Sequence, residues 1–153
     1  MEKKGILYWI AYALLLVWQL PQYVTALVMW PFMGKKTKIA DRHFNKCYMA
    51  ENMSGGISLG PIAYVSTRSA KRPETVAHET DGHTVDSKIL GPLYLFVVGI
   101  PSILNAAFDF TDCYYDFYPE RWANRHAGLN TGDNCRLAFD NPDDERNKPW
   151  DEA

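Results

Sequence analysis

Cysteine is scarce in this chain of 153 residues, and Cys47, Cys113 and Cys135 show no C-x-x-C spacing. An odd number of cysteines without that spacing argues against a disulfide framework, so we predict reduced thiols on a cytoplasmic side. Internal repeats and low-complexity tracts are absent as well, which excludes repeat architectures. A chain of this length is expected to form one domain.

Charge is absent from Ile6 to Met33. This run is longer than the ~20 apolar residues that cross a bilayer, and tryptophans stand near both of its ends, as in an interfacial aromatic belt. Pro21 predicts a kink, and Gln19 and Gln22 are expected to contact protein rather than lipid. We predict an N-terminal transmembrane helix over residues 1–34. A secretory signal is the competing interpretation, but the run is too long for one and shows no clear cleavage site.

Acidic residues are rare in the first half of the chain. Residues 1–72 carry a net charge of +7, whereas residues 73–153 carry −9. The basic residues mostly flank the apolar run instead of covering a folded body, which argues against a nucleic-acid binder. Four of them follow the run within ten positions and predict that this side faces the cytoplasm, although two lysines also precede it.

Local patterns predict the remaining elements. Residues 54–66 are glycine-rich and then β-prone, which predicts a short strand or hairpin. Pro73 predicts the start of a helix that ends near Gly91. Residues 89–108 form a second hydrophobic segment, which either crosses the membrane or re-enters it as a broken helix. Residues 129–153 are polar and acidic and predict a disordered tail.

The fold class is therefore expected to be mainly α with a short β hairpin or strand. One or two transmembrane helices are expected with it. A proline at position 119 predicts one more short helix, which carries Glu120.

The most informative segment of the sequence runs from His78 to His83 and reads H-E-T-D-G-H. In the zinc-peptidase motif H-E-x-x-H, two histidines four residues apart on one helical face bind the metal, and the glutamate between them activates water. Here the histidines are five residues apart. On a regular helix they would lie about 140° apart, too far for two ligands of one ion.

Three local structures address this spacing. A π-bulge with i→i+5 hydrogen bonds absorbs one extra residue, with Asp81 as the inserted residue facing solvent. Alternatively, the helix begins after His78, which then lies on a turn. In the third arrangement Glu79 and His83 face the metal together and Thr80 replaces the catalytic glutamate, so that the site binds metal without hydrolysing a substrate.

Flanking motifs strengthen the comparison with zinc peptidases. In chain order they are S-G-G-x-S-L-G at Ser54–Gly60, L-G-P-L-Y-L at Leu90–Leu95, and an aromatic run ending in E-R-W-A-N at Glu120–Asn124. With them, the chain resembles a small bacterial membrane-associated branch of the H-E-x-x-H zinc metallopeptidases, gluzincin-like in that a downstream E-x-x-A-[DN] motif supplies the third ligand. The resemblance covers most of residues 1–128 and departs from the family in the one-residue insertion.

This resemblance implies the roles of individual residues. His78, His83 and Glu120 would be the ligands of Zn²⁺, and Glu79 would be the general base. Asn124 would orient a ligand histidine. The edge along which an extended peptide adds as a strand would consist of Gly56, Ile57, Ser58 and Leu59.

The resemblance also implies a metallopeptidase-like domain over residues 35–128, with a zincin-like pair of active-site helices. The expected function is that of a zinc-dependent peptidase of the bacterial inner membrane, with its site facing the cytoplasm. Its expected partners are a peptide or protein substrate and the lipid bilayer, without nucleic acid. The alternative is a catalytically inactive relative that keeps the scaffold and acts by binding.

Overall fold

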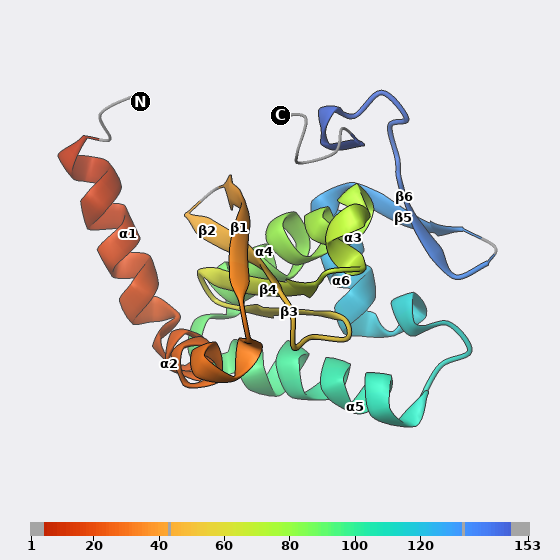
Figure 1. Cartoon of the computed structure of the whole chain (residues 1–153), viewed down its shortest axis with the longest axis horizontal. Helices are drawn as coiled ribbons and strands as arrows, with labels where there is room; N and C mark the ends of the chain where they lie inside the picture. Colours follow the sequence, from red (N-terminus) through yellow and green to blue (C-terminus); the bar gives the residue numbers. More distant parts are fainter. Residues whose placement is uncertain (1–4, 43, 133, 148–153) are drawn as a thin grey trace.

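The computed structural model describes residues 5–42, 44–132 and 134–147. Helix predominates, and two small sheets accompany it (Figure 1). The α-helices are α1 (Ile6–Trp18), α2 (Leu20–Met29), α3 (Pro73–Ala77), α4 (Thr84–Leu90), α5 (Ile100–Phe108) and α6 (Tyr118–Ala127). Two π-helices span His78–His83 and Leu95–Gly99. Short 3-10 helices span Trp30–Met33, Ser69–Lys71, Gly91–Leu93, Tyr114–Asp116 and Glu145–Asn147.

The first apolar run folds as two helices, which corrects the prediction of a single helix over residues 1–34. α1 and the helical segment after it are bent by 82° at Gln19. Pro21 then lies in the first turn of α2, where its missing N–H leaves no hydrogen bond unmade. Residues 1–4 lie outside the described part of the chain.

Among the described residues, no single helix is long and apolar enough to cross a membrane. Two bent pairs of helices meet that requirement together, by length and composition only. They are Ile6–Trp18 with Leu20–Met33, and Pro73–Leu93 with Leu95–Phe108, the second pair bent by 119°.

The larger sheet has the strand order β1-β2-β4-β3, so β3 lies at its edge. Its strands are β1 (Lys36–Arg42), β2 (Asn45–Ala50), β3 (Gly56–Leu59) and β4 (Ile62–Ser66). β3 and β4 form the antiparallel hairpin that the glycine-rich segment predicts, whereas β2 pairs with β4 in parallel. The sheet content therefore exceeds the single hairpin or strand expected from the sequence.

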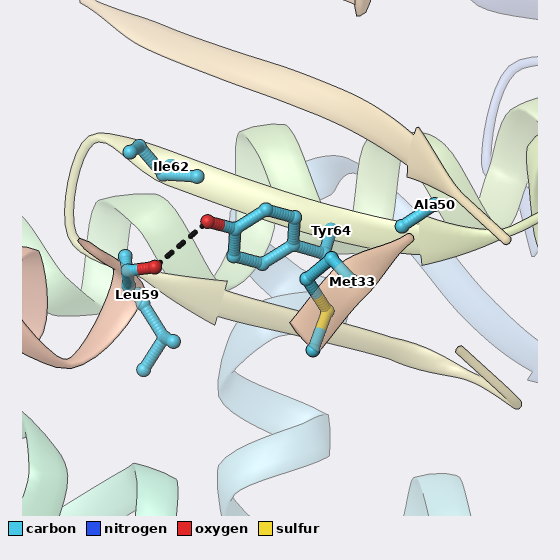
Figure 2. Packing of buried hydrophobic residues seen from close by; sticks show 6 residues of the cluster. Met33, Ala50, Leu59, Ile62 and Tyr64 are labelled. Carbon is cyan, nitrogen blue, oxygen red and sulfur yellow. Dashed lines mark hydrogen bonds between the residues drawn. The ribbon is translucent and has the colours of Figure 1, made fainter. Parts of the chain in front are cut away.

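Tyr64 of β4 anchors the core between this sheet and α2. Its side chain is fully buried, and its hydroxyl donates a hydrogen bond of 2.9 Å to the carbonyl of Ala26. Figure 2 shows Met33 and Leu59 close to its ring. Because α2 is attached to the sheet here, the edge strand β3 is held in place next to the segment that carries the histidines.

The end of the chain forms a hairpin, which corrects the prediction of a disordered tail over residues 129–153. β5 (Leu129–Gly132) pairs with β6 (Arg136–Phe139). Leu129, Leu137 and Phe139 are buried against α3 and α6, so the apolar positions of this polar segment suffice for a small cluster. Residues 148–153 lie outside the described part of the chain.

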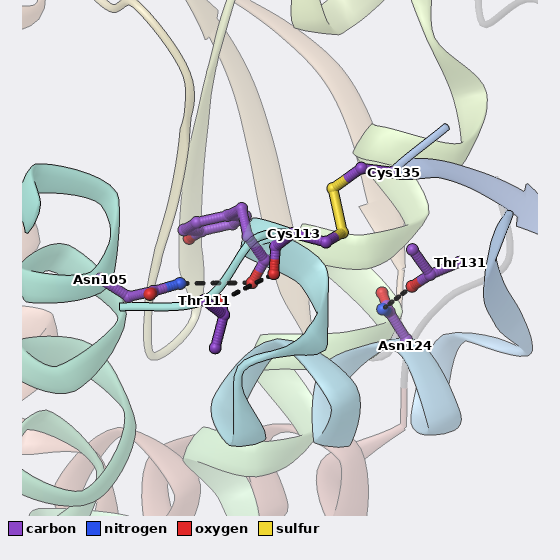
Figure 3. The surroundings of a disulfide bond; sticks show 7 residues. Asn105, Thr111, Cys113, Asn124, Thr131 and Cys135 are labelled. Carbon is purple, nitrogen blue, oxygen red and sulfur yellow. Dashed lines mark hydrogen bonds between the residues drawn. A yellow bond between two sulfur atoms is a disulfide. The ribbon is translucent and has the colours of Figure 1, made fainter. Parts of the chain in front are cut away.

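A disulfide joins Cys113 to Cys135 and ties this hairpin to the loop before α6 (Figure 3). The prediction of three reduced thiols is therefore wrong for this pair. The two cysteines are 22 residues apart in the sequence, and only the packing of the hairpin brings them together. Cys47 is the remaining thiol and is buried.

Candidate metal centre

The extra residue between the histidines is accommodated by a π-helix. α3 begins at Pro73, as predicted, and continues into the π-helix His78–His83 and then into α4. The i→i+5 hydrogen bonds of a π-helix bring residues five apart toward one face. The structure thus confirms the π-bulge, the first of the three arrangements considered from the sequence.

Gly82 sets the distance between the π-helix and α6. A Cβ atom at this position would lie 2.6 Å from the carbonyl oxygen of Ala123. Only glycine permits this close approach of the two backbones. The approach brings α6, with Glu120 in its first turn, against the histidines.

His78, His83 and Glu120 converge in one buried cluster. Their candidate ligand atoms all lie within 4.8 Å of one another, and no other such group of three occurs among the described residues. Glu120 Oε2 lies 3.0 Å from His78 Nε2 and 3.3 Å from His83 Nε2. Glu79 is not part of the group, so the arrangement in which Glu79 and His83 share a metal is not observed.

These distances fit a metal of tetrahedral geometry. Two ligands about 2.0–2.1 Å from a zinc ion lie roughly 3.3 Å from each other. The separations of Glu120 Oε2 from the two Nε2 atoms match that spacing. Two imidazoles and one carboxylate leave the fourth position free, as in catalytic zinc sites.

The outer nitrogen of each histidine contacts a polar side chain. His78 Nδ1 donates a hydrogen bond of 2.8 Å to Asn124 Oδ1, which leaves Nε2 as the ligand atom. His83 Nδ1 lies 3.4 Å from Asp86 Oδ2, and the other oxygen of Asp86 lies 2.9 Å from His126 Nδ1. Contacts of this kind orient metal-binding histidines and raise their basicity.

A chain of hydroxyl groups holds the other oxygen of Glu120. Ser102 Oγ donates a hydrogen bond of 2.5 Å to Glu120 Oε1, and Tyr114 Oη lies 2.8 Å from Ser102 Oγ. Ser102 belongs to α5 and Tyr114 to the loop before α6. The carboxylate is therefore oriented from three segments of the chain.

The charges of the cluster compensate one another. Burial alone would raise the pKa of Glu120, but His78 and His83 outweigh it and hold the pKa well below its ordinary value. Burial alone would lower the pKa of His83, but its contacts with Asp86 and Glu120 raise that pKa to about 10. Without metal, the site therefore holds an ionised carboxylate beside a protonated imidazole.

Glu79 is buried next to the cluster and is held by β3. Ser58 Oγ lies 2.6 Å from Glu79 Oε2 and 2.9 Å from the backbone carbonyl of Glu79. A Cβ atom at Gly56 would collide with the Glu79 carboxylate, so the glycine makes room for it. The charge of Glu79 contributes to the raised pKa of His83, consistent with a position beside the ligands.

The residues of β3 that were expected to bind substrate differ in their contacts and in their burial. Ser58 turns its hydroxyl toward Glu79, and its carbonyl accepts a hydrogen bond of 3.0 Å from Tyr94 Oη. Leu59 is buried in the core, whereas Ile57 is half-buried and packs against it. The strand as a whole stands at the edge of the sheet.

Asp81 is only partly exposed and is paired with an arginine, so the inserted residue is less open to solvent than predicted. Its Oδ2 lies 3.0 Å from Nη1 of Arg146, and 12% of its side chain is exposed. Asp144 Oδ2 lies 2.7 Å from Nη2 of the same arginine. The hydrogen bonds from Arg146 lower the pKa of Asp144 to about 2. The last described segment of the chain is thus attached to the π-helix.

The site predicted from the sequence lacks Asp86, Ser102 and Tyr114. For Asp86 a signal was present, because a carboxylate three residues after a ligand lies next to it on a helix. No local pattern marks the other two, which reach Glu120 from α5 and the following loop. A comparison with known protein families, with curated proteins and with solved structures found no significant match.

Proposed function

We propose that the chain is a zinc-dependent peptidase. The carrying observation is the buried group of His78, His83 and Glu120, whose candidate ligand atoms lie within 4.8 Å of one another, with Glu120 Oε2 close to both Nε2 atoms. The ordered polar partners around this group and the nearby Glu79 support the proposal. The carboxylate, the two imidazoles and the free fourth position favour zinc over hard cations, which prefer oxygen ligands.

A zinc ion bound there would supply a Lewis acid that polarises a carbonyl group and lowers the pKa of water. Glu79 would accept a proton from water as the water oxygen bonds to the carbonyl carbon, and would pass that proton to the nitrogen of the leaving amine, so that the C–N bond breaks and a carboxylic acid and an amine are released. Ser58 orients the Glu79 carboxylate through their 2.6 Å hydrogen bond. Gly56 keeps the space open in which that carboxylate lies.

A peptide in extended conformation is the substrate that the edge strand fits best. β3 pairs with β4 on one side only, and the backbone groups on the other side of an edge strand can pair with an added chain. One of the carbonyls of β3, that of Ser58, is already bonded to Tyr94 Oη, so an added peptide would pair with the remaining groups. Gly56 of this strand lies against the carboxylate of Glu79, and Ser58 donates a hydrogen bond to it. A peptide added along β3 would therefore lie next to the proposed base.

The proposal is tested first by the metal content of the full chain purified in detergent. Elemental analysis should find about one zinc per chain, and Glu120→Ala should lose most of it, because the variant removes one of three ligands. Glu79→Gln should keep the zinc and cannot accept a proton. A native chain without zinc would refute the proposed site.

Activity is then measured on a mixture of quenched fluorogenic peptides. The native chain should cleave them, 1,10-phenanthroline should stop cleavage, and added zinc should restore it. Glu79→Gln should lower the rate by roughly 10²-fold or more, the usual contribution of a general base. A zinc-loaded native chain that cleaves no peptide would instead support the inactive, binding form of this scaffold.

A further inference from the structure

The polarity of α5 is reversed relative to a helix on the surface of a water-soluble protein. Its outward side chains are apolar and exposed, with values of 54% for Ile103 and 67% for Phe108. Its inward side chains include Ser102 and Asn105, and Asn105 is almost fully buried. Ile100 and Leu104 of α5 are exposed in the same way, as is Phe96 in the π-helix that precedes α5, and these three residues recur four positions apart.

The inward polar side chains of α5 all have partners in the protein. Ser102 donates to Glu120 Oε1. Asn105 donates to the carbonyl of Tyr114 at 3.3 Å and accepts from the backbone N–H of Phe110 at 3.1 Å. The reversal is therefore built into the packing of this helix against the candidate metal centre.

The same reversal occurs in α2 and the residue before it. Gln22 is fully buried and donates to the carbonyl of Gly91, and Gln19 accepts a hydrogen bond of 2.8 Å from Ser87 Oγ. These contacts confirm the prediction that the two glutamines bind protein. The outward side chains are apolar and exposed, namely Leu20, Val24, Leu27 and Val28.

A helix in water turns its apolar stripe toward the core and its polar face outward. Where the surrounding medium is hydrocarbon, apolar side chains gain nothing by turning inward, and polar side chains turn toward other helices. α2 and α5 follow the second pattern. Figure 1 shows both helices along the same side of the molecule, away from β5 and β6.

We propose that the outward faces of α2 and α5 are embedded in the hydrocarbon of a lipid bilayer. Among the described residues, the exposed large hydrophobic side chains all belong to segments 6–32, 89–110 and 118–122, and none belongs to a strand. Large contiguous apolar patches on a protein surface mark sites of contact with a membrane or with another protein.

The charges that follow α2 fit the headgroups of anionic lipids. Residues 5–40 contain no acidic residue, and Lys35, Lys36 and Lys38 follow α2 within ten positions. Lys35 is exposed, and Lys36 Nζ lies 4.9 Å from the centre of the Trp30 ring. Basic residues next to an apolar surface are attracted to anionic membranes. This charge pattern favours a bilayer over a second copy of the chain, which would bring like charges together.

Nitroxide labels on the full chain in vesicles of phosphatidylcholine and phosphatidylglycerol test the proposal. The labelled variants are Leu27→Cys in α2 and Ile103→Cys in α5, with Thr67→Cys after β4 as the exposed control. The native cysteines do not interfere, because Cys47 is buried and the other two are bonded. Collisions with oxygen, which dissolves in hydrocarbon, are compared with collisions with a water-soluble nickel chelate.

The labels at Leu27 and Ile103 should collide with oxygen in preference to nickel, at a ratio several-fold above that of the control. Nickel access equal to that of the control at both sites would overturn the proposal, since the face would then lie in water. Exclusion of both reagents would also overturn it, because a protein surface would then cover the face. Phe108→Cys replaces Ile103→Cys if that variant fails to fold. The measurement does not depend on zinc, so its failure leaves the proposed peptidase untouched.

Discussion

Asn124 holds His78 through its side-chain oxygen, and its own amide nitrogen lies 3.4 Å from Thr131 Oγ1 (Figure 3). Asn124→Ala removes the group that orients the Nε2 atom of His78 toward the cluster. Zinc affinity should fall by about 10–100-fold, the usual cost of removing such a partner. Competition with a chromophoric chelator measures the loss. Asn124→Asp is the matched control and should keep zinc at least as tightly, because a carboxylate accepts the same hydrogen bond.

Gly56 makes room for the carboxylate of Glu79. Gly56→Ala should displace that carboxylate and lower the rate of peptide cleavage by at least tenfold, while zinc stays bound, since no ligand is touched. Gly55→Ala is the control, because no atom lies within 4 Å of a Cβ at that position. Equal rates for the two variants would show that Glu79 does not act from its observed position.

His83 carries a proton in the metal-free site, since its contacts raise its pKa to about 10. A zinc ion must displace this proton, so zinc affinity should rise with pH through the neutral range. One displaced proton corresponds to roughly tenfold in affinity per pH unit. Chelator competition at pH 6, 7 and 8 measures the slope. An affinity that does not change over this range contradicts a protonated His83.

At the scale of the element, the π-helix is the feature on which the site depends. Deleting Asp81 would place the two histidines four residues apart, and a regular α-helix would then bring them to one face. The deletion variant should therefore keep about one zinc per chain. Asp81→Ala keeps the π-helix and removes only the ion pair with Arg146, so it should also keep zinc. Elemental analysis distinguishes them: loss of zinc in the deletion variant alone would show that the π geometry cannot be replaced.

Local signals predicted the elements that carry the site. Pro73 and the proline at 119 mark the starts of their helices, and the glycine-rich segment forms the β3–β4 hairpin. The spacing of His78 and His83 was enough to propose a π-helix, because a regular helix excludes a shared ion. These signals lie within a few residues of the structure they specify.

Contacts between distant segments were not predictable in the same way. Ser102 reaches Glu120 only because α5 packs beside α6, and the sequence near Ser102 shows just an apolar run. The prediction of a disordered tail was wrong for the same reason. The few apolar residues of this segment are buried only because they pack against α3 and α6. The pairing of Cys113 with Cys135 depends on that packing as well.

At the scale of the whole molecule, the disulfide joins the C-terminal hairpin to the loop that carries Tyr114. Closing a loop of 22 residues stabilises a protein by about 3 kcal/mol. Replacing both cysteines by serine should therefore lower the Tm by roughly 6–12 °C. Thermal unfolding followed by circular dichroism measures the shift, and a reductant should lower the Tm of the native chain but not that of the double variant. A reductant without effect on the native chain contradicts the bond.

For a chain embedded in a bilayer, as proposed above, the disulfide also bears on which side of the bilayer the site faces. Disulfides persist in oxidising compartments and are rare in the cytoplasm, so we now propose that the site faces the non-cytoplasmic side. The lysines after the first apolar run favour the opposite side, but lysines at the other end of that run reduce their weight. In intact cells, maleimide-polyethylene glycol should modify Cys113 and Cys135 only after reduction. Modification of neither cysteine, even after reduction, would restore the cytoplasmic assignment, because the reagent does not cross the membrane.

The π-helix His78–His83 also changes how such a site must be searched for in genomes. A pattern that demands H-E-x-x-H, with two residues between the glutamate and the second histidine, rejects this chain, although its candidate ligands converge. In this chain the π-helix absorbs the inserted residue, and Gly82 lets α6 approach it. A query that allows two or three residues between the glutamate and the second histidine, followed by a downstream E-x-x-A-[DN], would recover both spacings. The length of that gap would then separate chains with a regular α-helix at the site from chains with a π-helix.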